Sequence, residues 1–96
     1  MVKRPRPSAD PKVADEAPSS SELTDYDCEL LICYLRLLDT EAEGADWREV
    51  ARIVLKVDPD REYIRAKRIY DTHLARARWM TEQGYRHLLA EADGEW

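Results

Sequence analysis

The sequence lacks the features that mark membrane, secreted or metal-binding proteins. It contains no apolar run near the roughly 18 residues that a membrane-spanning helix needs. Its start, MVKRPRP, is followed by polar residues and not by the apolar segment of a secretion signal. Cys28 and Cys33 are the only cysteines, and on a helix they would lie roughly 140° apart, too far round to form a disulfide or share a metal ion. We therefore expect a cytoplasmic protein with reduced cysteines, no membrane contact and no metal ion.

Motifs of catalytic sites are also missing. The sequence has no glycine-rich phosphate loop, no His-Glu-x-x-His motif, and no serine or cysteine in a recognisable nucleophile context. His73 lies within an apolar stripe, where a single histidine is more often a core residue than a base or a ligand, and neither His73 nor His87 has a partner at metal-ligand spacing. We expect no cofactor, and an enzyme is a poor hypothesis for this chain.

What the chain does contain is many charged side chains with an acidic balance. Twenty acidic residues against 15 basic ones give its 96 residues a formal net charge of −5. A chain of this length forms one small domain at most, with a modest core. Negative charge disfavours a protein whose affinity comes from neutralising phosphates, so any DNA binding is expected to be weak.

The first 21 residues, MVKRPRPSADPKVADEAPSSS, have neither helical nor strand periodicity and are rich in proline and serine. Such a composition cannot bury enough apolar surface to offset the entropy of ordering, which predicts a disordered tail over residues 1–21. Its basic start is compatible with an arm that touches nucleic acid. We favour a solvated tail, because the acids Asp10, Asp15 and Glu16 nearly cancel the basic charge.

From Thr24 onward, apolar residues recur at spacings of three and four, which predicts helices throughout and no strand. Thr24 is the predicted N-cap of a first helix that runs to about Asp39. An acidic loop follows. Asp46 and Glu49 then form a variant of the capping box before a second helix over residues 47–57, WREVARIVLKV.

Pro59 separates the second helix from a third one, because proline prevents a helix from continuing. The third helix is predicted from about Glu62 to Gln83, with Gly84 as a left-handed terminator. The segment YRHLLAEA predicts a short fourth helix. The fold class is therefore all-α: a small domain of four or five helices over residues 22–92, with a helix-turn-helix at its centre and the tail in front of it.

The third helix separates apolar from basic side chains. Its core side holds Tyr63, Ala66, Ile69, Tyr70, His73, Leu74, Ala77 and Met80. Its opposite side holds Arg65, Arg68, Thr72, Arg76 and Trp79. In a helix-turn-helix the second helix presents its outer face to the major groove, so these arginines either contact DNA or form a solvated face that balances the acidic remainder. Trp79 is predicted to pack under the fourth helix, with an exposed partner anchor as the alternative.

The first helix carries more apolar side chains than one face can bury. The stripe that suffices to join the core holds Tyr26, Leu30, Cys33, Tyr34, Leu37 and Leu38. Cys28, Ile32 and Leu35 point away from this stripe, and Leu31 lies on its border. Either the fourth helix and the loops cover this second side, or it is an open docking patch.

The segments LTDYDCELLICYLRLLDTEAEGADWREVARIVL, DP and HLARARWMTEQGYRHLL resemble a proteobacterial family of extended-turn helix-turn-helix domains, over roughly residues 23–90. The resemblance implies a regulator of the horizontal transfer of integrative and conjugative elements. Two-domain members of that family are transcriptional activators, whose N-terminal domain packs on one side of the helix-turn-helix while a basic surface on the other side binds DNA. Short acidic members, the QseM-like antiactivators, bind the N-terminal domain of an activator and so block activation.

This chain is acidic, and only the tail precedes its helices, so it is most similar to the antiactivators. The resemblance then implies that its partner is an activator's N-terminal domain, with a quorum-sensing regulator as a further target, and we expect the free chain to be a monomer. The predicted partner-binding residues are Cys28, Leu31, Ile32, Leu35 and Trp79. The alternative function is a small DNA-binding transcriptional regulator that uses the third helix. The predicted nucleic-acid-binding residues are Arg65, Arg68 and Arg76.

Overall fold

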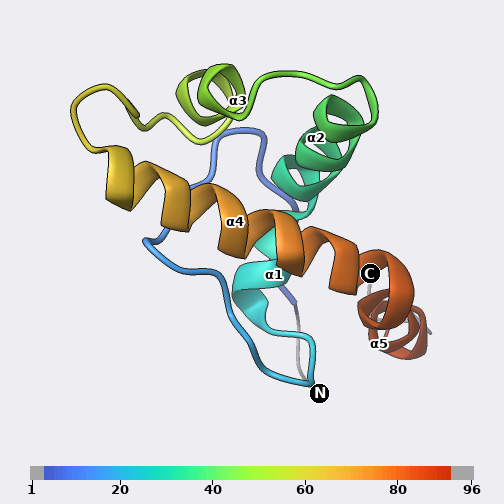
Figure 1. The fold of residues 1–96 in the computed structure, drawn as a ribbon. Helices are drawn as coiled ribbons and strands as arrows, with labels where there is room; N and C mark the ends of the chain where they lie inside the picture. The colour runs from blue at the N-terminus through green and yellow to red at the C-terminus, as the bar shows by residue number, and fades with distance from the viewer. Residues whose placement is uncertain (1–3, 92–96) are drawn as a thin grey trace.

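The computed structural model describes residues 4–91, and within this range every regular element is helical. In chain order these are α1 (Asp25–Glu29), α2 (Leu31–Ala42), α3 (Trp47–Ile53), α4 (Tyr63–Trp79), the π-helical turn η1 (Met80–Gly84) and α5 (Tyr85–Glu91). Helix α4 crosses the whole molecule, with α3 and α2 above it in the view of Figure 1 and α5 turned back at its end. The predicted all-α class is confirmed. Of the described helices, none is long and apolar enough to cross a membrane.

The predicted first helix is two helices that meet at Leu30. Thr24 caps α1 as predicted: its hydroxyl accepts from the Asp27 amide at 3.1 Å, and Asp27 Oδ2 accepts from the Thr24 amide at 3.0 Å. Leu30 leaves the helical conformation, with φ −92° and ψ 10°. Cys28, which a single helical wheel through residues 24–39 places away from the core, is fully buried and belongs to the core cluster.

Helix α3 begins at the predicted cap and ends earlier than predicted. Asp46 accepts from the Arg48 amide at 3.1 Å, whereas the Glu49 carboxylate pairs with Arg52 at 3.3 Å, so the predicted capping box is only half formed. After Ile53 the chain turns through Lys56, which has a positive φ of 59°. Val57 is buried in the core, as predicted, but it reaches the core through this turn and not as part of a longer helix.

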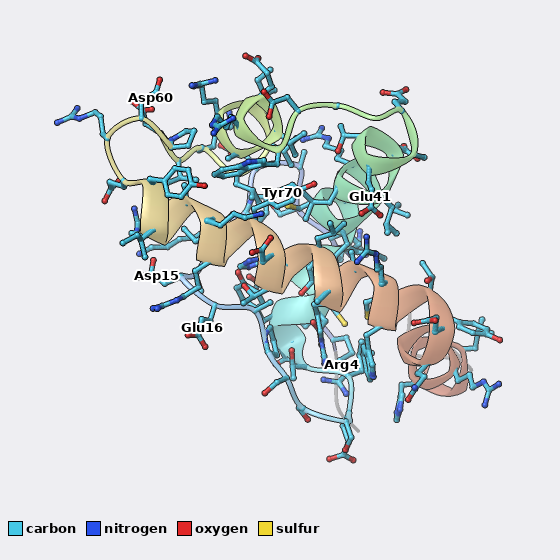
Figure 2. All side chains as sticks on the ribbon, in the orientation of Figure 1. Arg4, Asp15, Glu16, Glu41, Asp60 and Tyr70 are labelled. Carbon is cyan, nitrogen blue, oxygen red and sulfur yellow. The ribbon has the colours of Figure 1, made fainter. Side chains whose placement is uncertain are left out.

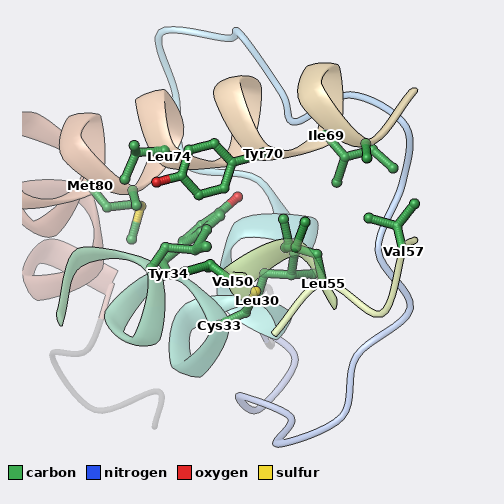
Figure 3. Close-up of a cluster of buried hydrophobic side chains, with 14 of the residues drawn as sticks. Leu30, Cys33, Tyr34, Val50, Leu55, Val57, Ile69, Tyr70, Leu74 and Met80 are labelled. Carbon is green, nitrogen blue, oxygen red and sulfur yellow. The ribbon is translucent and has the colours of Figure 1, made fainter. Parts of the chain in front are cut away.

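The core lies between α4 and α2 and is closed by α1, α3 and the turn after α3 (Figure 3). The large fully buried side chains include Leu30, Tyr34, Leu37 and Ile69. Each such side chain stabilises the fold by roughly 1.5–3 kcal/mol relative to an exposed one. Tyr63 differs from the prediction: it is 51% exposed. It lies at the rim, where its ring meets Trp47 edge-on with the ring centroids 5.5 Å apart.

Gly84 does not have the predicted left-handed backbone, because the helical path continues through η1 into α5. Glycine is needed there for a different reason. A Cβ atom at Gly84 would lie 2.5 Å from the Trp79 ring, far inside van der Waals contact. The close approach lets Trp79 stack on His87 of α5 at 6.1 Å between ring centroids. Trp79 thus packs against the last helix, the position that its sequence context favoured.

Residues 4–22, here called the N-terminal strap, have no helix or strand, as their composition predicts, but they do not form the predicted disordered tail. The strap lies against the helices (Figure 1). Three of its backbone amides donate hydrogen bonds to the helices. The Ser8 amide donates to the Glu29 carbonyl at 3.0 Å, the Ala14 amide to the Tyr26 hydroxyl at 2.8 Å, and the Ala17 amide to the Thr72 hydroxyl at 3.1 Å. Composition alone misses such partners because they come from distant helices. The predicted domain end, residue 92, lies outside the described residues.

A buried ion pair holds α1 against α4. Arg76 is 4% exposed and Asp27 is fully buried. The guanidinium donates to both carboxylate oxygens, with Nε 2.9 Å from Oδ1 and a terminal nitrogen 2.7 Å from Oδ2. Bidentate pairs of this kind are among the stronger hydrogen-bonded contacts in proteins.

Further hydrogen bonds extend this pair into a network. Asp27 also accepts from the Tyr34 hydroxyl at 2.8 Å, and Arg76 donates to the carbonyls of Ser20 at 2.6 Å and Glu22 at 2.9 Å. Burial by itself raises the pKa of Asp27, but the hydrogen bonds from Arg76, Thr24 and Tyr34 outweigh it and hold the pKa below its ordinary value. The network therefore joins the strap, α1, α2 and α4 around one ionised carboxylate.

His73 connects α4 to the strap through Tyr26. Its Nδ1 lies 2.7 Å from the Ile69 carbonyl, which can only accept, so Nδ1 donates and Nε2 accepts from the Tyr26 hydroxyl at 2.6 Å. The Tyr26 oxygen accepts in turn from the Ala14 amide. Burial lowers the pKa of His73, so the neutral ring belongs to the folded state.

Replacing Arg76 with methionine should lower the free energy of unfolding by about 3–5 kcal/mol, because the Asp27 carboxylate is left buried without its partner. Urea unfolding followed by circular dichroism measures this loss. The control is Arg78→Met, which removes an exposed pair with Glu41 and should cost less than about 1 kcal/mol. Equal losses in the two variants would contradict the assigned role of the buried pair.

The contribution of His73 to stability should be fully present well above pH 6.5 and be lost as the pH falls through and below that value. The unfolded chain takes up a proton on His73 near its ordinary pKa of 6.5, whereas the folded chain takes it up only at lower pH. His73→Gln should flatten this part of the pH profile of the unfolding free energy, while His87→Gln should leave it in place. An unchanged profile in His73→Gln would rule out this origin of the pH dependence.

Candidate functional site

The structure divides the predicted arginine stripe of α4 into two parts. Arg65 and Arg68 lie on the surface, with side chains 45% and 58% exposed. Arg76 lies in the buried pair with Asp27, so its prediction as a nucleic-acid-binding residue is corrected. The wheel placed it on the outer side, but that side of α4 is covered near its C-terminal half by α1 and the strap.

The exposed side of α4 carries residues at the spacing of one helical stripe. Ile64 is 77% exposed, and Arg68 and Asp71 follow it at intervals of four and three, which places all three on one face. Lys67 flanks this stripe. Its ammonium lies 4.9 Å from the centre of the Trp47 ring and 3.1 Å from an Asp71 carboxylate oxygen. We call Ile64, Arg68 and Asp71 the outer stripe.

Acidic side chains of the strap neutralise the surface arginines. Asp15 accepts from Arg65 Nε at 2.9 Å, and Glu16 lies 3.9 Å from Arg68 Nε. Figure 2 shows both acids beside the first turns of α4. Arg65 also donates to Glu62 at 3.0 Å. Because the side chains are largely exposed, each pair is weak and open to exchange.

Neither these two acids nor two members of the outer stripe, Ile64 and Asp71, are among the site residues predicted from the sequence. The signal for Ile64 and Asp71 is their position: an isoleucine and an aspartate sit at helical spacing from Arg68, outside the core side. No comparable signal in the sequence marks Asp15 and Glu16, because each lies 50 residues or more along the chain from the arginine that it contacts.

The predicted partner-binding residues do not form one open patch. Cys28 is fully buried, and Leu31 and Ile32 are half-buried, so only Leu35, at 54%, is well exposed. The prediction for Cys28 is corrected, because its side chain is closed into the core and out of a partner's reach. Trp79 is not an open anchor either: its ring stacks on His87, and the Arg76 guanidinium carbon lies 3.7 Å from the ring centre.

An apolar groove does remain between α2 and the start of α5. It has a volume of about 180 Å³. Its lining residues are Leu31, Tyr34, Leu35, Leu38, Ala77, Met80, Thr81 and Tyr85. Leu35 and Tyr85 are its exposed rim. Leu31 and Leu35 were predicted from the sequence as partner-binding residues, whereas Tyr85 was not. Tyr85 lines the groove because the chain continues as a helix through η1.

Comparison with known families identifies a regulator domain. The model of the RovC DNA-binding domain family, described as "T6SS, Transcription factor, DNA binding domain", matches residues 3–90 and thus includes the strap as well as the helices. No curated protein matches the chain. The description fits the alternative function, a small DNA-binding regulator, better than the antiactivator that the resemblance implied, and it does not show the QseM-like identity. The chain belongs to the RovC DNA-binding domain family.

Proposed function

We propose that the chain is a small DNA-binding transcriptional regulator that contacts DNA with the exposed face of α4. The observation that carries this proposal is the outer stripe on the second helix of a helix-turn-helix, in a chain whose family is described as a transcription factor DNA-binding domain. In this motif the second helix lies in the major groove, and residues near its N-terminus contact the base edges. Ile64 and Arg68 lie in the first turns of α4.

The chemistry of the outer stripe suits base edges. A guanidinium such as that of Arg68 donates to two acceptors of guanine, and a carboxylate such as that of Asp71 accepts from the amino group of cytosine. Ile64 offers apolar contact to a thymine methyl group. An isoleucine that is 77% exposed gains most from such a contact, because it buries apolar surface that water otherwise covers.

Basic residues around the turn before α4 are placed to hold the phosphate backbone. Lys56 and Arg61 are exposed there, and Arg52 donates to Asp60 at 2.8 Å in the same turn (Figure 2). Phosphate contacts fix the orientation of a protein on the duplex without reading its sequence. Because the chain carries a net charge of −5, its long-range field does not attract DNA, so affinity must come from these local contacts, and each phosphate contact adds to the salt dependence of binding.

Replacing Arg68 with alanine should weaken binding to a duplex from the upstream region of the chain's own gene by about 1–3 kcal/mol, and should relax sequence preference at one base position. Fluorescence anisotropy titration at low salt measures both. The matched control is Arg86→Ala in α5, which removes the same charge from another helix. If both variants lose affinity equally, or neither does, α4 is not the reading helix.

We infer a second candidate function from the apolar groove between α2 and α5. An acidic chain with an open apolar groove fits an antiactivator that binds the N-terminal domain of a transcriptional activator and so blocks expression of conjugative-element excision and transfer genes. Leu35 and Tyr85 at its rim are the side chains that a partner would reach first.

Under this second function, Leu35→Asp should weaken binding to an isolated activator N-terminal domain by about 2 kcal/mol or more, as expected for a central apolar contact. Titration calorimetry with the purified domain is the measurement. Ile53→Asp serves as the control, since Ile53 is equally apolar, is exposed on α3 and does not line the groove. The second function is excluded if the wild-type chain forms no complex at micromolar concentration.

A further inference from the structure

The strap occupies one edge of α4 in a regular way. Two adjacent acids, Asp15 and Glu16, face two arginines one helical turn apart, Arg65 and Arg68. The next residue, Ala17, donates its amide to the Thr72 hydroxyl at 3.1 Å. Residues 15–17 of the strap therefore lie along the same helix that is proposed to enter the major groove.

The two acids of this segment resemble DNA phosphates in their chemistry. Carboxylate and phosphate oxygens accept from guanidinium groups with the same planar geometry. Arginine side chains are common donors to phosphate oxygens in protein–DNA complexes. The pairs that Asp15 and Glu16 make with Arg65 and Arg68 are therefore of the kind that phosphates would make.

We propose that the edge of α4 that carries Arg65 is a binding site for DNA phosphates, and that Asp15 and Glu16 occupy this site in the free chain in place of phosphates, held there by the hydrogen bond from the Ala17 amide to Thr72. In the same state Glu16 restrains Arg68, the base-reading residue of the outer stripe. The proposal rests on the proposed DNA-binding function. It names where the backbone contacts lie and what covers them in the absence of DNA.

The contacts of the strap favour local release over complete detachment. The Asp15 and Glu16 side chains are 64% and 65% exposed, so their ion pairs are weak. The residues on either side are held more firmly. The Ala14 amide donates a hydrogen bond to the Tyr26 hydroxyl, and the Ser20 carbonyl accepts one from the buried Arg76 guanidinium. Residues 15–17 can therefore leave α4 while the strap stays attached on both sides.

Space beside the helix allows this movement. A cavity of about 450 Å³ lies between residues 16–21 of the strap and the Thr72, Ala75, Arg76 and Trp79 side of α4. The strap is thus not packed tightly on α4 over this stretch. A duplex brings many phosphates to the helix and releases their condensed counterions, whereas the strap offers two carboxylates, so DNA wins the competition.

The test combines Asp15→Asn and Glu16→Gln in the full chain. This double variant should bind the upstream duplex about tenfold more tightly than the wild type, since two weak competing pairs are removed. Its control combines Asp39→Asn and Glu43→Gln, two exposed acids on the α2 side that remove the same charge. Adding Arg65→Ala to the first variant should abolish the gain.

Hydrogen exchange of the Ala17 amide provides a second readout. DNA should speed its exchange in the wild-type chain, because the bond to Thr72 breaks when phosphates replace the strap. The proposal is overturned if the two double variants gain affinity equally, which would show a general charge effect, or if Ala17 stays protected in the complex. If the Asp15 and Glu16 variant binds no DNA at low salt, the proposed function fails together with this inference. If wild type and variant bind equally and Arg68→Ala still weakens both, only this inference fails.

Discussion

The buried pair between Arg76 and Asp27 is the interaction on which the arrangement of the other parts depends. It joins α4 to α1, and its remaining hydrogen bonds reach Tyr34 in α2 and the carbonyls of Ser20 and Glu22 at the end of the strap. A charge taken out of water is tolerated only where its partners satisfy it. Here each side of the pair brings further partners, so one ionised carboxylate fixes the mutual positions of several segments.

This pair also explains why the arginines of α4 have different roles. Arg65 and Arg68 lie where α4 faces water and the acids of the strap, and Arg76 lies where α4 faces α1. All three are alike in the sequence. What distinguishes them is the element packed opposite. Of these three arginines, only the two in the first turns of α4 are open to solvent, and this is where a helix-turn-helix contacts base edges.

Local signals in the sequence predicted much of the fold. The caps at Thr24 and Asp46 and the core side of α4 depend on neighbouring residues, and the structure contains them. The burial of Arg76 and the packed strap were missed, because each depends on residues distant in the chain. The break at Leu30 was missed because no residue type at that position marks it. Arg65 and Arg68 were predicted as site residues because their spacing within one helix marks them. The acids that pair with them were not predicted, because they lie 50 residues or more away in the chain.

The central claim is that one exposed face of α4, partly covered by the strap, meets DNA. Amide chemical-shift mapping by NMR, with a duplex from the upstream region added to the labelled wild-type chain at low salt, tests it most directly. The proposed interface predicts the largest changes at Ile64, Arg65, Arg68 and Ala17, with the groove residues Leu35 and Tyr85 unaffected. Changes concentrated at Leu35 and Tyr85, with Arg68 unchanged, would contradict it.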